Sequence, residues 1–250
     1  MKLKTMQLYF IRHGQSANNL LYERSESDDG RESDPELTDY GRRQAKLLAR
    51  FLVAERSATP AVRDAYPQNI DGYHLTHIYA SPMIRAMDTA APIVQAFGIT
   101  PQVWPDLHEV GGMWNNHPEN DERIGEAGPP RAFFEKRYPQ FTLPDSFDDN
   151  GWWNKPHESF EESIERAKRV WQRLHDLHGE TADRVAFVSH GMFYNALMTV
   201  LLEIPLPPKI WFLINNTAIT RIDFELSEWE ETMRLAYQNR VDFLPPELVT

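Results

Sequence analysis

Short runs of apolar residues alternate along the chain with longer segments in which apolar residues recur every three or four positions. The runs predict strands at residues 7–11, 76–80, 101–104 and 184–188. The longer segments predict helices at about residues 39–56, 82–97, 159–178 and 192–203, because this spacing places apolar side chains on one face of a helix. Residues 218–224 and 235–239 are predicted to form an antiparallel pair of strands.

Start and stop signals accompany two of these helices. Ser81 followed by Pro82 predicts an N-cap and a first helical residue. Ser159 opens the sequence Ser-Phe-Glu-Glu, which is typical of a capping box. Gly98 and Gly179 follow the last apolar positions and predict the ends of the two helices.

The alternation of strands and helices predicts the α/β fold class. We expect a three-layer sandwich with a mostly parallel central sheet, helices on both faces and antiparallel C-terminal strands. Residues 1–250 are predicted to form a single domain. Residues 113–157 are rich in Asn, Pro, Asp, Glu and Trp, and we expect an irregular insertion or lid there, with a short helix near 130–137. Packing is a more common role than substrate stacking for its tryptophans, Trp114, Trp152 and Trp153.

Composition narrows the class of protein. The 250 residues include 26 Lys and Arg against 37 Asp and Glu, a net charge of −11, which argues against a general binder of nucleic acid or anionic membranes. The absence of cysteine excludes disulfides and thiolate metal sites. No apolar run approaches the roughly 18 residues of a membrane span, and Arg12 interrupts the first apolar run, so no signal peptide is expected. We therefore expect a soluble cytoplasmic protein, of undetermined oligomeric state.

Two segments are predicted to be loops. Residues 23–39 contain eight acids and two arginines, a net charge of −6, and are interpreted as a solvated loop. Residues 57–73, which include Pro60 and Pro67, are interpreted in the same way.

Three predicted strands end in polar, chemically capable residues just before a helix. The first strand leads into Arg12-His13-Gly14, the second into Ser81-Pro82 with Arg85 one turn later, and the fourth into Ser189-His190-Gly191. In an open α/β sheet, ligands bind beyond the carboxyl ends of the parallel strands. We therefore expect one site that contains Arg12, His13, Arg85 and His190.

This set of side chains suits a phosphate group. The guanidinium fork of arginine matches phosphate oxygens, and the N–H groups at helix starts favour anions. A neutral histidine can attack phosphorus and carry the phosphoryl group on nitrogen. Because the arginines and the second histidine would stabilise the transferred charge, we expect neither a metal nor a cofactor.

Further residues, in order along the chain, make the chain resemble the histidine phosphatase superfamily, in the branch that contains the cofactor-dependent phosphoglycerate mutases and related phosphatases. The matching residues are Arg12-His13-Gly14-Gln15-Ser16, Asn19, Asp34, Leu37-Thr38, Gly41, Gln44-Ala45, Ser81-Pro82, Arg85-Ala86, Thr89-Ala90, Leu107-His108-Glu109, His157-Glu158-Ser159, Val188-Ser189-His190-Gly191 and Asn216-Thr217-Ala218-Ile219-Thr220.

The resemblance implies a role for each of several positions. His13 would be the phosphorylated nucleophile and Glu109 the proton donor to the leaving oxygen, with Asp106 and His108 as the neighbouring alternatives. The phosphate would contact Arg12, Asn19, Arg85, His190 and Gly191.

The predicted function is a phosphatase that acts on a small phosphate monoester through a phosphohistidine, without a metal. One alternative is a phosphoglycerate mutase-type phosphotransferase, but Val-Gly-Gly-Met-Trp-Asn-Asn-His-Pro after Glu109 departs from the mutase pattern. The other is a non-catalytic phosphate-binding or interaction domain. Ser16 stands where the secreted phytase and acid-phosphatase branch typically carries arginine.

Other polar residues receive weaker interpretations. His175 and His178 have a spacing that suits a metal pair, but no third ligand is evident, and we expect solvated side chains, as for His74 and His77. Five cations of the insertion either recognise a second anionic group or are solvated: Arg123, Arg131, Lys136, Arg137 and Lys155.

Overall fold

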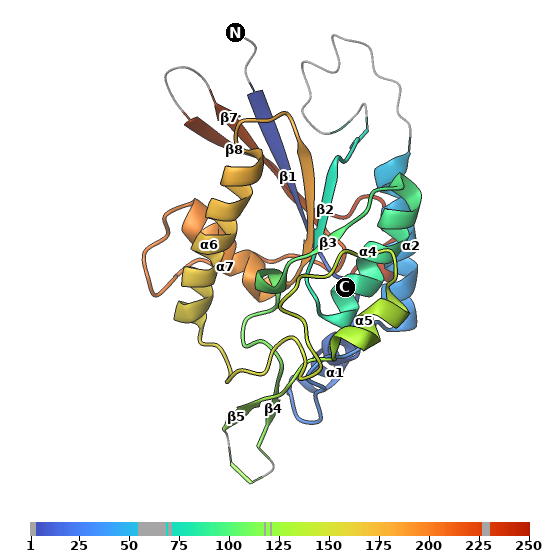
Figure 1. Ribbon diagram of the computed structural model, residues 1–250, viewed down its shortest axis with the longest axis vertical. Helices are drawn as coiled ribbons and strands as arrows, with labels where there is room; N and C mark the ends of the chain where they lie inside the picture. The colour runs from blue at the N-terminus through green and yellow to red at the C-terminus, as the bar shows by residue number, and fades with distance from the viewer. Residues whose placement is uncertain (1–3, 55–68, 70–71, 118, 121, 227–230) are drawn as a thin grey trace.

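A six-stranded sheet crosses the centre of the computed structural model, which describes residues 4–54, 69, 72–117, 119–120, 122–226 and 231–250 (Figure 1). The strands lie in the order β3-β2-β6-β1-β7-β8. Their bounds are β1 (Lys4–Arg12), β2 (His77–Ala80), β3 (Gln102–Val103), β6 (Arg184–Ser189), β7 (Ile219–Leu226) and β8 (Glu231–Arg240). Most of the loop predicted at 57–73 lies outside the described residues.

The sheet is mostly parallel. Strand β6 pairs in parallel with β1 on one side and β2 on the other, and β2 pairs in parallel with β3. Strand β7 runs antiparallel to β1 and to β8. This arrangement confirms the predicted α/β class with an antiparallel C-terminal pair.

Helices cover both faces of the sheet, as predicted. Figure 1 shows α2 (Asp39–Val53) and α4 (Ile84–Phe97) on one side, and α6 (Phe160–His178) and α7 (Gly191–Leu201) on the other. The alternation of side chains along a strand supplies both cores. In β1, Tyr9 and Ile11 are buried on the side of α2 and α4, whereas Leu8 and Phe10 are buried against α6 and α7.

Two helix starts differ from the predictions. Helix α1 (Ala17–Ser25) was not predicted; its signal is Ser16, whose side chain forms a capping box with Asn19. Helix α4 begins at Ile84 with Met83 as its N-cap, so the prediction that Ser81 caps it was wrong. In the structure, the hydroxyl of Ser81 accepts from the N–H of Met83 at 3.3 Å, ahead of the helix, and also lies 2.7 Å from a ring nitrogen of His190.

The segment 113–157 combines short elements with buried aromatic side chains. It contains the hairpin β4 (Trp114–Asn116) and β5 (Arg123–Gly125) and the helix α5 (Arg131–Arg137), which confirms the helix predicted near 130–137. Outside this segment, the described residues also form two 3₁₀ turns, η1 (Pro105–Leu107) and η2 (Pro246–Leu248). Trp152 and Trp153 are only 8% and 6% exposed, so both contribute to packing. The hairpin projects past the lower end of the sheet in Figure 1, where the carboxyl ends of the parallel strands lie.

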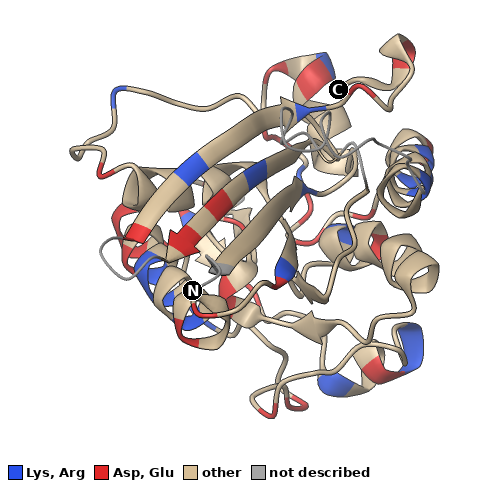
Figure 2. Ribbon diagram, turned by 90° about the horizontal axis from the view of Figure 1, so that it is seen from above, with Lys and Arg blue, Asp and Glu red and all other residues tan. Residues whose placement is uncertain are grey.

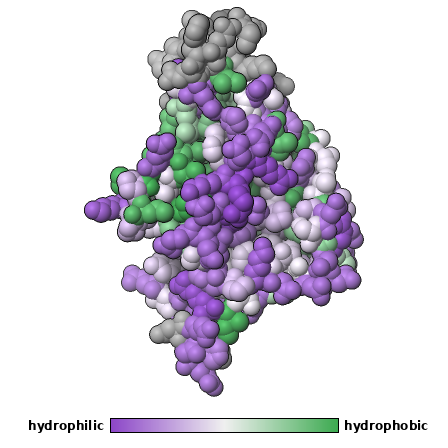
Figure 3. Space-filling view, turned by 60° about the vertical axis from the view of Figure 1, so that its left-hand side comes forward, coloured by the Kyte–Doolittle hydropathy of each residue, from purple (hydrophilic) through white to green (hydrophobic). Residues whose placement is uncertain are grey.

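The face of the molecule drawn in Figure 3 is predominantly polar. Acidic and basic residues are interspersed over the helices and strands in Figure 2, and Figure 3 shows a mostly hydrophilic face with smaller apolar areas. Within the described part of the chain, no helix combines the length and the apolar character needed to cross a membrane.

Candidate active site

Four side chains predicted to meet at one rim of the sheet lie together. Arg12 ends β1, His13 follows it, His190 follows β6, and Arg85 extends from the first turn of α4. The imidazole rings of His13 and His190 are 5.1 Å apart between centroids. The Nε of Arg85 lies 3.2 Å from Nε2 of His13. Parallel pairing of β1, β6 and β2 therefore brings together residues up to 178 positions apart in the chain.

The surroundings of His13 define its tautomer. Its Nδ1 lies 2.7 Å from the carbonyl oxygen of Gly14, an acceptor, so Nδ1 carries the proton. The other nitrogen, Nε2, then has a free lone pair and accepts the bond from Arg85. Burial, with Arg85 and Arg12 nearby, lowers the pKa of His13 well below its usual value. The ring is therefore neutral at physiological pH, and Nε2 is available as a nucleophile.

Two buried polar atoms beside His13 have no hydrogen-bond partner among the described residues. They are Nε of Arg12 and Nδ1 of His190. The rest of each group is anchored, since Nη1 of Arg12 donates to the carbonyl of Ile214 at 2.6 Å and Nε2 of His190 contacts Ser81. Buried polar groups are nearly always paired, so these two atoms are available to bind a ligand near His13.

A small pocket of about 170 Å³ lies beside Arg12, His13 and Arg85, whereas His190 is not among its lining residues. It is lined by Arg12, His13, Ser16, Asn18, Asn19, Leu21, Tyr22, Ser27, Asp28, Arg31, Pro35, Arg85 and Glu109. A larger hollow of about 820 Å³ lies against α2 and α4 but is lined by none of the four converging side chains. We therefore place the candidate active site in the smaller pocket, which Arg12, His13 and Arg85 line.

Glu109 reaches the pocket and also caps α7. One carboxylate oxygen accepts hydrogen bonds from the backbone N–H groups of Val110 and Phe193 at 2.8 and 2.9 Å. The other accepts from the N–H of Met192 at 3.2 Å. The N–H groups of Met192 and Phe193 at the α7 N-terminus are therefore engaged by a side chain of the protein, which leaves Gly191 as the predicted phosphate contact of this helix start.

Asp34 occupies the start of α4 in the same manner. Its two oxygens accept from the N–H of Ile84 at 3.0 and 3.2 Å, and Oδ1 lies 3.5 Å from Nη1 of Arg85. Burial raises the pKa of Asp34 to about 7, although Arg85 and the N–H of Ile84 act in the opposite direction. The interpretation of residues 23–39 as solvated was therefore wrong for Asp34, whose side chain is only 6% exposed.

The other two predicted phosphate contacts lie at the edge of this group. Asn19 lines the pocket, and its Oδ1 accepts from the backbone N–H of Ser16 at 3.1 Å and from the amide of Asn216 at 3.2 Å. Gly191 begins α7 beside the Arg12 guanidinium, since a methyl group at this position would meet Nε of Arg12 at 3.5 Å.

The loop after β1 is held by close contacts and hydrogen bonds from distant elements. Gly41 of α2 packs so tightly that an added Cβ would lie 2.1 Å from the carbonyl oxygen of Gln15. The N–H of Gly14 donates to Thr89 at 2.9 Å. Asn216 donates to the carbonyl of His13 at 2.9 Å. These contacts explain why small or polar residues occupy these positions, since the loop needs them to hold His13 in place.

The alternatives to Glu109 point elsewhere. His108 is buried beneath the ring of Trp153, with ring centroids 4.5 Å apart, and its Nε2 lies 4.0 Å from Glu158. Both Asp106 and His108 line a separate hollow beside α6. Arg166, which pairs with Glu158, donates to the carbonyls of both residues at 2.7 and 3.0 Å. The structure thus brings Glu109, and neither alternative, into the candidate pocket.

The five cations of the insertion have different surroundings. Arg131 pairs with Glu135 on α5, and Arg137 pairs with Glu36 and Asp88. Arg123 instead lies 4.6 Å from the ring of Trp114. Lys155 lies 5.5 Å from the ring of Trp153, and Lys136 is exposed.

Arg31 is a pocket residue that the sequence did not single out. Its guanidinium lies 3.5 Å from the centroid of the Trp114 ring, and Nη1 donates to the Trp114 carbonyl. Burial, with positive Arg85 and Arg123 nearby, lowers the pKa of Arg31 to about 10, and Asp28 and Glu126 offset part of this effect. Only the tertiary structure could identify it, because it sits within the acidic segment.

Sequence comparisons identify relatives over most of the chain. The profile of the histidine phosphatase superfamily (branch 1) matches residues 8–62 and 63–234. A protein of Yersinia pestis (strain Pestoides F), described as a probable phosphoglycerate mutase GpmB, is 26% identical over 226 residues. These residues cover 90% of this chain and 87% of that protein.

Solved structures share the fold. A mycobacterial glucosyl-3-phosphoglycerate phosphatase superposes with a TM-score of 0.58 at 19% identity, over 95% of this chain and 100% of that one. The phosphoserine phosphatase of Entamoeba histolytica, in complex with 3-phosphoglyceric acid, gives a TM-score of 0.56 at 20% identity, over 96% of this chain and 100% of that one. At these identities the likeness concerns the fold.

Proposed function

The chain belongs to the histidine phosphatase superfamily, and from this premise we propose that it hydrolyses small phosphate monoesters through a phosphohistidine on His13, without a metal. The observation that carries the proposal is the tautomer of His13. Its Nδ1 proton is engaged by the Gly14 carbonyl, so the lone pair of Nε2 faces Arg85 beside two unpartnered buried donors. A phosphoryl group placed there would meet the nucleophile and its electrostatic partners together.

In the first step, the lone pair of His13 Nε2 attacks phosphorus and forms a P–N bond. The P–O bond to the leaving group breaks, and its electron pair goes to the leaving oxygen, which takes a proton from Glu109. Arg85 exchanges its bond to Nε2 for bonds to phosphoryl oxygens. Nε of Arg12 and Nδ1–H of His190 donate to the same oxygens, with the Ser81 hydroxyl donating to Nε2 of His190.

In the second step, water attacks the phosphoryl group. The proton of the water goes to the Glu109 carboxylate, the P–N bond breaks, and its electron pair returns to Nε2 of His13. Inorganic phosphate leaves, and the neutral histidine and protonated glutamate of the first step are restored. The low pKa of His13 favours this cycle, because the free ring does not need to lose a proton before it attacks.

Replacement of the nucleophile tests this mechanism. His13→Ala should lower kcat by at least about 10³-fold, as loss of a covalent nucleophile does, and labelled substrate should trap an acid-labile phosphoenzyme in the wild type only. The surface variant His175→Ala, which removes an ion pair with Glu231, is the matched control and should keep full activity. A folded His13→Ala protein with wild-type turnover would refute the mechanism.

The pocket also supports a substrate class. Arg31 lies in the same pocket as His13, and Arg123 lies against the same tryptophan ring. A substrate that carries a carboxylate near its phosphate would place a second negative charge beside these cations. Phosphoserine and 3-phosphoglyceric acid, which are bound in structures of the phosphoserine phosphatase of Entamoeba histolytica, have this chemistry. We include such carboxylated phosphate esters in the proposal.

Selectivity between two substrates tests this part separately. Arg31→Gln should reduce kcat/KM by about 10-fold or more for 3-phosphoglycerate, and much less for glycerol 3-phosphate, which lacks the carboxylate. Arg50→Gln on the exposed side of α2 is the control and should change neither. Equal losses on both substrates would show that Arg31 does not recognise the carboxylate, whereas the phosphohistidine mechanism would stand.

A phosphoglycerate mutase activity is the second candidate, because the Yersinia relative bears that description. Both reactions would begin with the same phosphoenzyme and differ in whether water or a substrate hydroxyl takes the phosphoryl group. A mutase must exclude water at that stage. Parallel assays of phosphate release and of 2- and 3-phosphoglycerate interconversion distinguish the two, and we expect phosphate release to dominate.

A further inference from the structure

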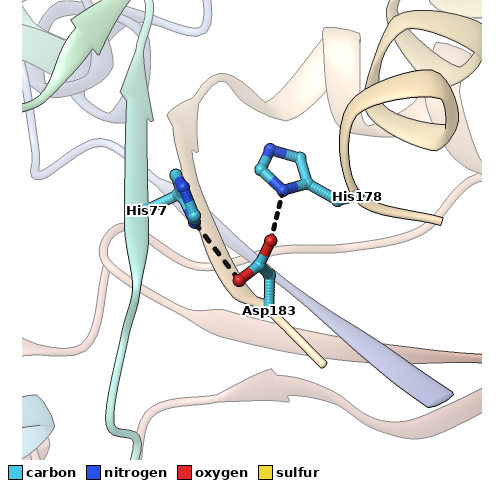
Figure 4. A group of neighbouring side chains, drawn as sticks. All are labelled: His77, His178 and Asp183. Carbon is cyan, nitrogen blue, oxygen red and sulfur yellow. Dashed lines mark hydrogen bonds and ion pairs between the residues drawn. The ribbon is translucent and has the colours of Figure 1, made fainter. Parts of the chain in front are cut away.

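Three potential metal ligands meet at the end of the sheet opposite the candidate active site. His77 is the first residue of β2, Asp183 directly precedes β6, and His178 is the last residue of α6. Figure 4 shows both imidazole rings directed toward the carboxylate of Asp183. We refer to these three residues as the distal cluster. Its members come from three separate parts of the chain. The sequence had paired His178 with His175 by their spacing and had shown no third ligand.

The distances suit a small cation. Nδ1 of His178 lies 2.8 Å from one oxygen of Asp183, and Nδ1 of His77 lies 3.8 Å from the other. One ligand atom from each residue falls within 4.8 Å of the others. Ligand atoms around a tetrahedral zinc ion are about 3.3 Å apart, given bond lengths of about 2.0–2.2 Å. The side chain of His77 is 38% exposed, so this ring has room to rotate toward the other two ligands.

The hydroxyl groups of Tyr79 and Thr76 contact the two histidines and can adjust their hydrogen bonds when a cation binds. Nε2 of His178 lies 2.8 Å from the hydroxyl of Tyr79, which can either donate or accept. When a cation takes Nδ1, Nε2 carries the proton and donates to Tyr79, which is the outer support that ligating histidines usually have. The hydroxyl of Thr76 contacts Nδ1 of His77 at 2.9 Å and also accepts a hydrogen bond from the N–H of Arg184. If Nδ1 of His77 binds a cation, Thr76 loses the first contact and keeps the second.

We propose that the distal cluster binds one divalent transition-metal ion of the zinc class, with two histidine nitrogens, one aspartate oxygen and a water as ligands. The set of two nitrogens and one carboxylate matches zinc better than calcium or magnesium, which prefer oxygen ligands. The exposed side of His77 provides the path of entry and the position for the water.

The ion would be structural rather than catalytic. It would join the amino ends of β2 and β6 to the end of α6, and these two strands carry the residues that lead to Arg85 and His190 at their other ends. A bound ion stabilises the folded state by mass action, because the unfolded chain does not present the three ligands together. We therefore expect the melting temperature to change, and kcat to stay the same.

Calorimetric titration of the chelator-stripped protein with Zn²⁺ tests the proposal. The wild type should bind one equivalent and gain about 5 °C in Tm at saturating zinc. His77→Ala and Asp183→Asn should weaken binding by about 100-fold or more, beyond the loss typical of an outer-shell partner. Asp183→Asn keeps an oxygen that can accept from His178, so this variant should retain the fold without metal. Co²⁺ should give the absorption of a tetrahedral nitrogen and oxygen site.

Two control variants separate the distal cluster from other histidines. His175→Ala removes a histidine that lies on the same helix as His178 and is about as exposed as His77, 34% against 38%. This variant should bind zinc as the wild type does. His13→Ala should also bind one equivalent. Absence of saturable binding by the wild type would overturn the proposal. So would binding that survives in His77→Ala and disappears in His13→Ala, since the ion would then lie between the catalytic histidines.

Discussion

The ionisation of Asp34 links the candidate active site to stability. The folded protein raises the pKa of this residue from 3.8 to about 7, so it retains a proton that the unfolded chain has released. The contribution of Asp34 to the free energy of unfolding therefore falls as the pH rises from about 4 to 7, and then stays constant. Asp34 also lies 3.5 Å from Arg85, so the pairing with Arg85 develops over the same pH range.

Asp34→Asn should remove this pH dependence. Relative to the wild type, the free energy of unfolding of the variant should improve by on the order of 2–4 kcal/mol between pH 4 and pH 8. Urea denaturation at both pH values measures the difference. Activity at pH 8 should fall by about 10-fold, because Arg85 loses its partner. A constant stability difference across the range would show that Asp34 is ionised at all these pH values.

Glu109 has a structural and a proposed chemical role that can be separated. Glu109→Gln keeps the shape but removes the transferable proton. The loss of kcat should be on the order of 10²–10⁴-fold for an alkyl phosphate, and much smaller for nitrophenyl phosphate, whose leaving group needs no proton. The amide NH₂ of the variant would face a backbone N–H of the α7 N-terminus, where the carboxylate accepts a hydrogen bond. We therefore expect the variant to have a lower Tm than the wild type.

Asp106→Asn serves as the control, because Asp106 lines the neighbouring hollow. This variant should not change the ratio of kcat values for the two substrates. If Glu109→Gln reduced both reactions by the same factor, the carboxylate would be important for the N-terminus of α7 and not for proton transfer.

At the scale of elements, the contact between α2 and the loop after β1 controls the position of His13. Gly41→Ala would place a Cβ 2.1 Å from the carbonyl oxygen of Gln15, so helix and loop must separate. We expect a loss of about 1–3 kcal/mol in the free energy of unfolding and a fall in kcat, measured by denaturation and by turnover.

Gly98→Ala provides the matched control. An added Cβ at Gly98 meets nothing within 4 Å, and the substitution costs only the strain of a positive φ of 64° at the end of α4, about 1 kcal/mol. Its kcat should remain at the wild-type value. Equal effects of the two variants on kcat would show that the loop tolerates displacement by α2.

At the scale of the whole molecule, the two ends of the sheet have different proposed roles. The carboxyl end holds the candidate active site, and the amino end holds the distal cluster. Exhaustive chelation of zinc-loaded protein should therefore lower Tm and leave kcat and KM unchanged, because arginines and histidines supply the charge of a catalytic metal. Vanadate and inorganic phosphate should inhibit competitively. Loss of activity that Mg²⁺ or Zn²⁺ restores would contradict the proposed metal independence.

Much of the fold was predictable because its signals are local. Apolar periodicity predicted α6, and its capping box at Ser159 and its end at Gly179 follow from the sequence. The motifs at Arg12-His13 and at His190 are carried by strand ends, and the parallel sheet brings them together. The catalytic roles given to these residues remain predictions.

Other features depend on packing between residues that are far apart. Asp34 lies in an acidic segment that resembles a solvated loop, yet it is buried because the segment folds over the start of α4, 50 residues later. His178 was expected to be solvated, but the end of α6 packs against Tyr79, 99 residues earlier, and buries the ring. The sequence determined which residues form strands and helices, because these signals act over a few residues. Only the tertiary structure decided which charged groups are buried and paired, because burial depends on which elements pack together.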